Sequence, residues 1–382
     1  MSLSDNFVPV HIADELDVKN YSSDCWINKL SIFDQSFPLL DGKKIALIGI
    51  VSEESKYEAN HVRNFLYSMT KIEYASVFVD LGNFIFDYQD GRIQEKLGFT
   101  LSEIIGAGLI PILIGSSQEL TYAQYMAFEY LERYVNIISV DSRIDLNLDD
   151  EGDVKDDNYL SKILMKEPPY LFNLCQLAYQ SHQTDSRVLK LLENYHFDFI
   201  RLGKIRDSFE EIEPIVRSGD LLSFDISAIR QSDSSACNSP SPSGLFAEEA
   251  CRICRIAGAS NNLASAAFYE FNSMKDKRGQ SAHLIAQMIW YFTDGVYHRI
   301  TEGKFNDSNN YVKYMTTDQD NVHEMVFYKS KKSNRWWMEV PVSHKKKNYI
   351  GKELFPCSYK DYELATKGEI PERWWKALKK LS

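Results

Sequence analysis

Acidic and basic side chains stand together at the points where apolar runs of the sequence end. Asp141, Arg143 and Asp145 close one such run, and Asp225 and Glu270 close two others. Carboxylates at these points can bind a metal ion, transfer protons or hold a cationic ligand. They can equally cap loops and pair with arginine. The residue types alone leave both interpretations open.

The apolar runs predict a buried parallel sheet. They are continuous rather than alternating, as expected for strands that are covered on both faces. Eight of them are Lys44–Val51, Ala75–Leu81, Leu109–Gly115, Val135–Asp141, Tyr170–Cys175, Phe197–Leu202, Leu221–Ser227 and Ser265–Phe271. The amphipathic stretches between and after them include Ile93–Gly106, Leu120–Arg133, Ser186–Tyr195, Phe246–Ala257 and Gln280–Gly295. The alternation predicts a three-layer α/β/α domain with about eight mostly parallel strands, and chemistry beyond their carboxyl ends.

The composition changes at about residue 301. Residues 301–382 carry a net charge of +5, against −11 for the whole chain, and hold four of its six tryptophans. We therefore predict an N-terminal arm at 1–42, the α/β/α domain at 43–300 and a C-terminal extension at 301–382. In the extension, Glu324–Lys329 and Trp336–Val342 predict a β-hairpin, and Pro371–Leu381 predicts a helix. Its tryptophans either anchor it on the core or bind a protein partner.

The composition also argues against several classes of protein. A net charge of −11 is unfavourable for a general nucleic-acid or anionic-membrane binder. No apolar run reaches the roughly 18 residues that span a bilayer, and the first residues lack the pattern of a secretory signal. Six cysteines are too few for a disulfide framework. We interpret Cys251 and Cys254 as packing residues of a helix rather than as a redox pair or part of a zinc site. We expect a cytoplasmic protein.

Three segments that follow the apolar runs resemble a known set of motifs. They are Gly115–Thr121 (GSSQELT), Asp141–Asp145 (DSRID) and Asp225–Arg230 (DISAIR). In order and spacing, residues 43–298 resemble the ureohydrolase superfamily of arginases, agmatinases and formimidoylglutamases. The formimidoylglutamase-like proteins of Bacteroidetes are the most similar group. The resemblance implies an arginase-like fold, a homo-oligomer, and hydrolysis of linear amidines by a hydroxide that bridges two Mn²⁺ ions.

The chain departs from the family at half of its six metal ligands. The resemblance assigns one metal to Gln118, Asp141, Asp145 and Asp225, and the other to Arg143, Asp141, Asp225 and Ser227. Gln118 and Arg143 stand where the family has histidine, and Ser227 stands where it has aspartate. Arg230 replaces a further aspartate. Because arginine keeps its proton near neutral pH and offers no lone pair, the second metal site cannot form as in the family.

We hypothesise that Arg143, with Arg230, takes the place of the second metal and pairs with Asp141 and Asp225. No bound metal is the primary expectation. The alternative is one Mn²⁺ or Mg²⁺ at the first site, because its donors are all oxygens.

Glu270 stands at the position of the family carboxylate that faces the substrate. It is therefore a candidate for ligand binding and, with Asp145, for catalysis if the protein is active. The favoured function is an inactive family member that binds a ligand or a protein partner. The alternative is an active metal-dependent hydrolase of a linear amidine similar to formimidoylglutamate.

Overall fold

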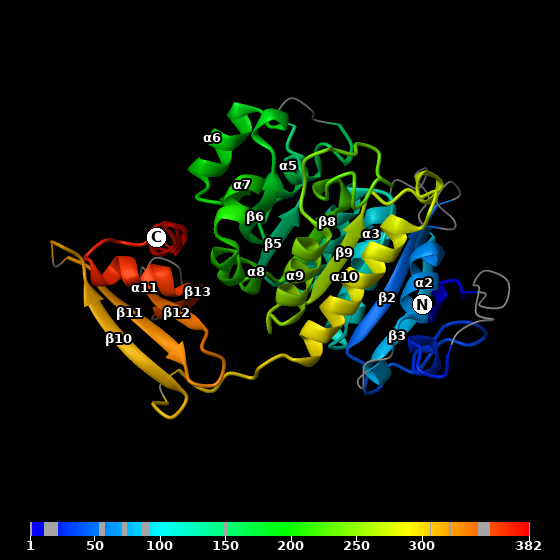
Figure 1. Cartoon of the computed structure of the whole chain (residues 1–382), viewed down its shortest axis with the longest axis horizontal. Helices are drawn as coiled ribbons and strands as arrows, with labels where there is room; N and C mark the ends of the chain where they lie inside the picture. Colours follow the sequence, from blue (N-terminus) through cyan, green and yellow to red (C-terminus); the bar gives the residue numbers. More distant parts are fainter. Residues whose placement is uncertain are drawn as a thin grey trace.

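A computed structural model describes residues 2–10, 22–52, 58–70, 75–85, 92–147, 152–305, 307–320, 322–342 and 352–381 (Figure 1). Its centre is a nine-stranded sheet in the order β1-β3-β2-β4-β9-β8-β5-β6-β7, with parallel neighbours throughout. The strands are β1 (Ser31–Ile32), β2 (Ile45–Val51), β3 (Phe78–Ile85), β4 (Ile110–Ile114), β5 (Val135–Val140), β6 (Leu171–Tyr179), β7 (Asp198–Arg201), β8 (Leu221–Asp225) and β9 (Ser265–Tyr269). Each predicted run overlaps one of strands β2 to β9. The predicted mostly parallel α/β fold is confirmed.

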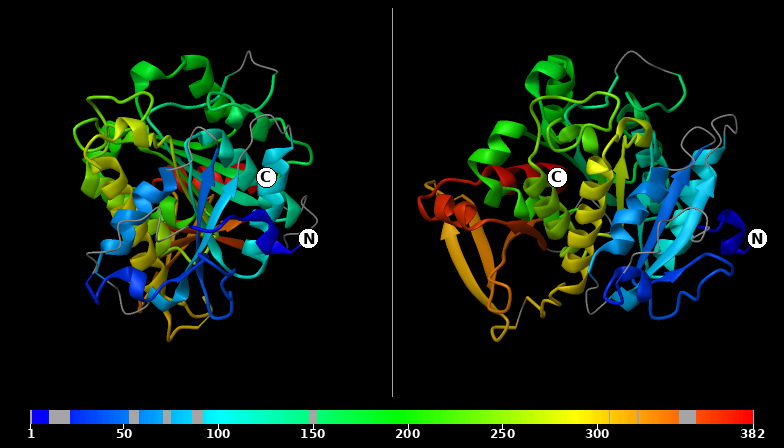
Figure 2. Two further views of the ribbon diagram at one scale, coloured as in Figure 1. Left: turned by 90° about the vertical axis from the view of Figure 1, so that its right-hand side faces the viewer. Right: turned by 45° about the vertical axis from the view of Figure 1, so that its right-hand side comes forward.

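Helices cover both faces of this sheet, because the strands are apolar on both sides. In β2, Ile45 and Leu47 enter one core while Ala46 and Ile48 enter the other. Helices α2 (Glu58–Ser68), α9 (Ala247–Gly258) and α10 (Gln280–Tyr297) pack on the first core. Helices α3 (Ile93–Gly106) and α4 (Thr121–Tyr130) pack on the second core. Figure 2 shows α10 in yellow and α3 in cyan on opposite sides of the strands.

Four shorter helices complete the core: α5 (Tyr159–Leu164), α6 (Ser186–Asn194), α7 (Leu202–Asp207) and α8 (Glu213–Arg217). No helix in the described part of the chain is both long enough and apolar enough to cross a membrane.

The N-terminal residues extend one edge of the sheet. Strand β1 pairs with β3, and Val8 forms a β-bridge with Asn83. Gly82 makes this approach possible. Its φ is +80°, and a Cβ atom there would lie 2.2 Å from the carbonyl oxygen of Val8.

The C-terminal residues form a small antiparallel sheet with its own core. Strands β10 (Tyr311–Thr317), β11 (Glu324–Ser330), β12 (Trp336–Pro341) and β13 (Lys352–Cys357) follow one another in the sheet. Helices α11 (Tyr359–Thr366) and α12 (Glu372–Leu381) pack on it around Trp336 and Trp374. Strands β11 and β12 form the hairpin that the sequence predicts, whereas β10, β13 and α11 were not predicted.

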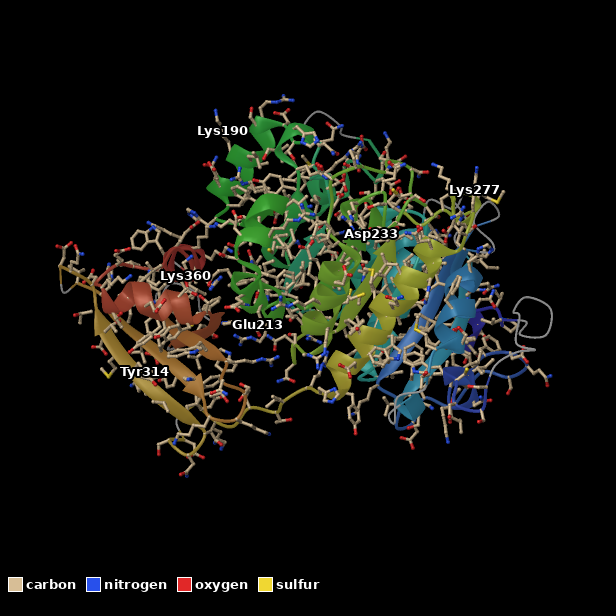
Figure 3. The ribbon with its side chains drawn as sticks, in the orientation of Figure 1. Lys190, Glu213, Asp233, Lys277, Tyr314 and Lys360 are labelled. Atoms are coloured by element: carbon tan, nitrogen blue, oxygen red, sulfur yellow. The ribbon has the colours of Figure 1, made fainter. Side chains whose placement is uncertain are left out.

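This C-terminal module contacts the core at the amino ends of β6 to β8. Lys376 pairs with Asp198, the first residue of β7, at 3.2 Å. The ring of Phe355 stacks on Phe172 near the start of β6. Glu213 of α8 lies on the side of the core that faces the module (Figure 3). The module therefore lies at the amino ends of these strands, opposite their carboxyl ends.

Candidate functional site

Side chains that follow the carboxyl ends of four strands meet where these parallel strands end, a place called the carboxyl edge of the sheet below. Gln118 follows β4, Asp141 and Asp145 follow β5, Asp225 ends β8, and Glu270 follows β9. Because all of these strands are parallel, their ends lie together, toward the top of Figure 1. Gln118, Asp141 and Asp225 are buried, and Asp145 is partly buried.

Asp141 is held by donors from its own loop and from the loop after β8. Its Oδ1 accepts from the backbone N–H of Arg143 at 3.0 Å and from the Ser227 hydroxyl at 3.2 Å. Burial raises the pKa of Asp141, and these hydrogen bonds offset part of the rise. A further hydrogen bond joins Asp141 to Asp145.

Asp145 is the partner in that hydrogen bond. Burial raises its pKa well above the usual range, and the negative charge of Asp141 and the contact with it raise the pKa further. The pKa of Asp225 is also raised well above its usual value, first by burial and then by the charges of Asp141 and Glu270. Like charges in a shared, buried site cannot all be ionised without a counter-ion. The three aspartates therefore share at least one proton or attract a cation.

Gln118 lies between two of these carboxyl groups. In the amide orientation that satisfies its neighbours, the nitrogen donates to Asp145 Oδ2 at 3.0 Å and to Asp225 Oδ2 at 3.3 Å. The amide oxygen then accepts from the Tyr159 hydroxyl at 3.3 Å. A neutral N–H donor thus bridges the two acids. Rotating the amide by half a turn would instead present its oxygen to them.

Ser227 completes the hydrogen bonding of the aspartates. Its backbone N–H donates to Asp225 Oδ1 at 2.6 Å, and its hydroxyl donates to Asp141. Ser227 is buried and also lies 3.2 Å from the hydroxyl of Ser142. One serine therefore links the loops that follow β5 and β8.

The predicted arginine pairs are wrong. The Arg143 side chain is exposed, and its Nε donates to Gln183 Oε1 at 3.1 Å; only its backbone reaches Asp141. Arg230 pairs instead with Asp233 at 2.8 Å and lies over the Phe246 ring at 4.2 Å. The Arg143 side chain is exposed and that of Arg230 is partly exposed, and burying either charge among the aspartates would cost several kcal/mol.

Glu270 is at the site in an unusual backbone conformation. Its φ is +64°, in the left-handed region that a residue with a side chain rarely adopts. Burial raises its pKa to about 7, with the charges of Asp156 and Asp141 adding to the effect. Asn238 Nδ2 donates to its Oε2 at 3.3 Å.

Two further acids at this edge were not among the predicted site residues. Asp156 accepts from the Ser117 hydroxyl at 2.7 Å and from the Glu119 backbone N–H at 2.9 Å. Glu58, the first residue of α2, is buried, and burial raises its pKa to about 8. The segment after Lys44–Val51 contains three glutamates, Glu53, Glu54 and Glu58, so the rule that found the aspartates points to this segment without selecting Glu58. Asp156 lies farther from any predicted strand end and gives no such signal.

The donor set does not suit the two metals that the sequence resemblance implies. The sequence resemblance assigns Arg143 and Ser227 to two ligand positions of the second metal, and in the structure the Arg143 side chain is exposed and donates to Gln183. Among the residues that the structure describes, no group of three or more histidine, cysteine, aspartate or glutamate side chains has the arrangement needed to hold a metal ion. The remaining donors, Gln118 with Asp141, Asp145 and Asp225, are chemically suited to a single hard cation.

Comparison with known proteins identifies the fold and the family. The arginase family model matches residues 50–294. The chain is 24% identical over 210 residues to formimidoylglutamase of Geobacillus thermodenitrificans, a match covering 52% of this chain and 64% of that enzyme, just under two thirds of its length.

Solved structures show the same fold. Formimidoylglutamase of Bacillus subtilis superposes with a TM-score of 0.65 at 16% identity, covering 75% of this chain and 96% of that one. Formiminoglutamase of Trypanosoma cruzi, solved with Mn²⁺, superposes with a TM-score of 0.62 at 20% identity, covering 69% of this chain and all of that one. From the matched residues and this fold, we conclude that the chain belongs to the arginase family.

Proposed function

We propose that this chain is an arginase-family protein that lacks the two-manganese centre and binds a ligand at the carboxyl edge of its sheet without hydrolysing it. The observation that supports this most is the bridging position of Gln118. In the amide orientation that satisfies its neighbours, its nitrogen donates to Asp145 and Asp225, where the family pattern would have a metal ligand. Neutral donors from Gln118, Ser227 and the backbone thus satisfy acids that would otherwise need cations.

Charge supports the same proposal. Two divalent ions are neutral overall with four aspartates and two neutral histidines. This chain keeps only three of those aspartates and none of the histidines, so its donors are too few in number and charge for two ions. Arg143 cannot donate a lone pair, whichever way it points.

The test is the metal content of the purified protein after dialysis against excess Mn²⁺ and then against buffer. We expect well under one tightly bound ion per chain. The variant Gln118→His/Arg143→His/Ser227→Asp restores the family ligands and should gain bound Mn²⁺. A matched control, Arg230→His/Ser142→Asp, should not. Two bound ions in the unmodified protein would contradict the proposal.

A single-metal hydrolase of a linear amidine is the second candidate. It is favoured by the three aspartates, which form no ion pair with any described lysine or arginine, and by the all-oxygen donor set. The T. cruzi relative, whose structure holds Mn²⁺, supports manganese as the ion to test first. This candidate predicts one bound Mn²⁺ or Mg²⁺ per chain and turnover of formimidoylglutamate. Asp225→Asn should abolish both, and turnover that survives this change would exclude it.

Further features are proposals that rest on the sequence. All six cysteines are free thiols, which supports a cytoplasmic protein. We also propose that the chain divides after residues 42 and 300 into an arm, a core domain and an extension. We propose in addition that the chain forms a homo-oligomer, as the family implies. A protein partner at the C-terminal module is a further proposal. Three of its tryptophans are buried, and Trp375 is 41% exposed and available for contact.

A further inference from the structure

A cavity lies between the core and the C-terminal module, at the amino ends of β5 to β8. Its volume is about 360 Å³, within the range of roughly 300 to 1,000 Å³ that small-molecule sites occupy. The core lines it with Asn136 of β5, Asn173 of β6, and Asp220, which precedes β8. The module covers it with α12 and with Glu353 of β13. Figures 1 and 2 show α12, in red, on the side of the module that faces the core. The cavity is therefore at the opposite end of the strands from the candidate site.

Polar side chains form a row across the amino ends of the strands in this cavity. Asn136 and Asn173 are register partners in β5 and β6, so their side chains leave the same face of the sheet. Asn136 donates to Asp220 Oδ2 twice, from Nδ2 at 2.6 Å and from its backbone N–H at 2.8 Å. Asn173 Nδ2 donates to Asp198 Oδ2 at 3.3 Å. The row thus holds two carboxylates in fixed positions.

The basic side chains of the cavity already have acceptors within the protein. The pairs are Lys376 with Asp198 and Glu372, Arg373 with Asp361, and Lys380 with Asn173. An anionic ligand would have to compete with these internal acceptors for each cation. The basic residues therefore do not make this cavity an anion site.

Two acids of the cavity lack a basic partner. Within the described chain, no lysine or arginine forms an ion pair with Asp220 or Glu353. Both bonds to Asp220 end on Oδ2, and its Oδ1 accepts no hydrogen bond from the described residues. Burial raises the pKa of Asp220 to about 6, and the bonds from Asn136 offset part of the rise. Asp220 is therefore mostly ionised at pH 7 and keeps one oxygen for a donor from outside the protein.

We propose that this cavity binds a small primary amine, whose ammonium donates to Asp220 Oδ1 and whose apolar body packs against Phe172 and Phe355. Both rings line the cavity, and they stack on each other with their centroids 6.4 Å apart. Glu353 adds a second negative charge. A guanidinium fork matches both oxygens of a carboxylate, whereas an ammonium is a compact charge that one oxygen can serve. Because Asn136 occupies Oδ2, the site favours an ammonium.

The experiment is isothermal titration calorimetry of the purified full chain with 2-phenylethylamine. The comparison ligands are 2-phenylethanol, which is neutral, and phenylacetate, which is an anion. We expect one amine to bind per chain, the alcohol to bind at least tenfold more weakly, and phenylacetate not to bind. Asp220→Asn should weaken the amine at least tenfold, and Glu353→Gln at least threefold. Glu369→Gln, at an exposed module position that does not line the cavity, is the matched control and should leave the affinity unchanged.

Asparagine and glutamine keep nearly the shapes of the acids they replace, and circular dichroism with thermal melting verifies the fold of each variant. Should Asp220→Asn not fold, Glu353→Gln and the comparison ligands on the unmodified protein decide the question. Amine binding that is absent at millimolar concentration, no tighter than that of the alcohol, or unchanged in folded Asp220→Asn overturns the inference. Tighter binding of 2-phenylethylguanidine than of the amine overturns its ammonium part.

Discussion

At the scale of single residues, the site is governed by the cost of burying negative charge. A buried carboxylate needs a proton, a hydrogen-bond donor or a cation. Asp141 has donors from the backbone and Ser227, whereas the pKa of Asp145 is raised by burial and by its acidic neighbours. In the amide orientation that satisfies its neighbours, Gln118 donates to Asp145 and Asp225. Glu58 lacks a donor on one oxygen. The ionisation of Glu58 is therefore the clearest measure of how the site carries its charge.

We predict that the free energy of unfolding falls as the pH rises, and that ionisation of Glu58 causes much of this fall. Its folded pKa of about 8 lies above the usual 4.5, so the folded state holds the proton more tightly than the unfolded state. The resulting stability is fully present below pH 4.5 and is lost as pH rises through about 8. Glu58→Gln should reduce the loss of unfolding free energy between pH 5 and 9 by roughly 2 to 4 kcal/mol.

Urea denaturation at several pH values measures this effect. Glu103→Gln, at an exposed position, is the control and should leave the pH dependence unchanged. A Glu58→Gln variant with the same pH dependence as the unmodified protein would show that Glu58 ionises normally in the folded state.

Residue types at motif positions predicted that Gln118 and the aspartates gather at one place, but not where each side chain points. The chemistry of arginine alone excludes Arg143 as a metal ligand, because a guanidinium has no lone pair to donate. Its direction depends on the turn after β5, which sends the side chain to Gln183 and solvent. The bridging of Asp145 and Asp225 by Gln118 depends in the same way on distances that only the fold sets. Sequence reasoning therefore found the aspartates but not their partners.

At the scale of elements, helix α2 determines where Glu58 lies. Arg63 of α2 makes two bonds to Asp80 of β3, from Nε at 2.8 Å and from Nη2 at 3.0 Å. Tyr67, one turn further on, donates to the same carboxylate at 2.6 Å. Arg63 and Asp80 are completely buried, and Asn60 and Asn83 accept from the remaining guanidinium nitrogen. This satisfied network fixes the helix against the sheet.

We predict that Asp80→Ala lowers the free energy of unfolding by about 3 to 5 kcal/mol, because it leaves the buried Arg63 charge without a partner. The double variant Arg63→Met/Asp80→Ala removes both charges and should lose less than the sum of the losses of the single variants Arg63→Met and Asp80→Ala. Chemical denaturation of the three variants measures the difference. Strict additivity would mean that the pair contributes no coupling energy.

The core elements were predictable because their patterns are strong. Ile93–Gly106 matches α3 at both ends, and the continuous apolar runs could only be buried strands. Strand β10 was missed because most of its side chains are exposed or partly exposed, so no apolar run marks it. Strand β13 contains Pro356, which weakens a strand pattern, and it is tolerated there because β13 lies at a sheet edge.

At the scale of the whole molecule, the candidate site and the C-terminal module lie at opposite edges of one sheet. The charge and the tryptophans of residues 301–382 predicted a separate extension. No local sequence pattern indicates which end of the core strands such an extension will contact. That information lies in long-range pairs such as Lys376 with Asp198 and Lys380 with Asn173. The module therefore leaves the carboxyl edge to the ligand and braces the amino ends of β6 to β8.

Arg217 is the residue through which this bracing can be tested. It ends α8, is 5% exposed, and pairs with Glu213 at 2.8 Å. Its Nη2 donates to the carbonyl of Trp336 in β12, and its guanidinium lies 4.6 Å from the Trp337 ring. One core side chain thus makes an ion pair, a hydrogen bond and a cation–π contact at the boundary with the module.

We predict that Arg217→Met lowers the free energy of unfolding by roughly 2 to 4 kcal/mol and exposes module tryptophans to water, seen as a red shift of fluorescence. Arg255→Met, which removes an exposed ion pair with Asp294, is the matched control and should alter neither property. An Arg217→Met protein with unchanged stability and fluorescence would instead show that this contact does not hold the module against the core.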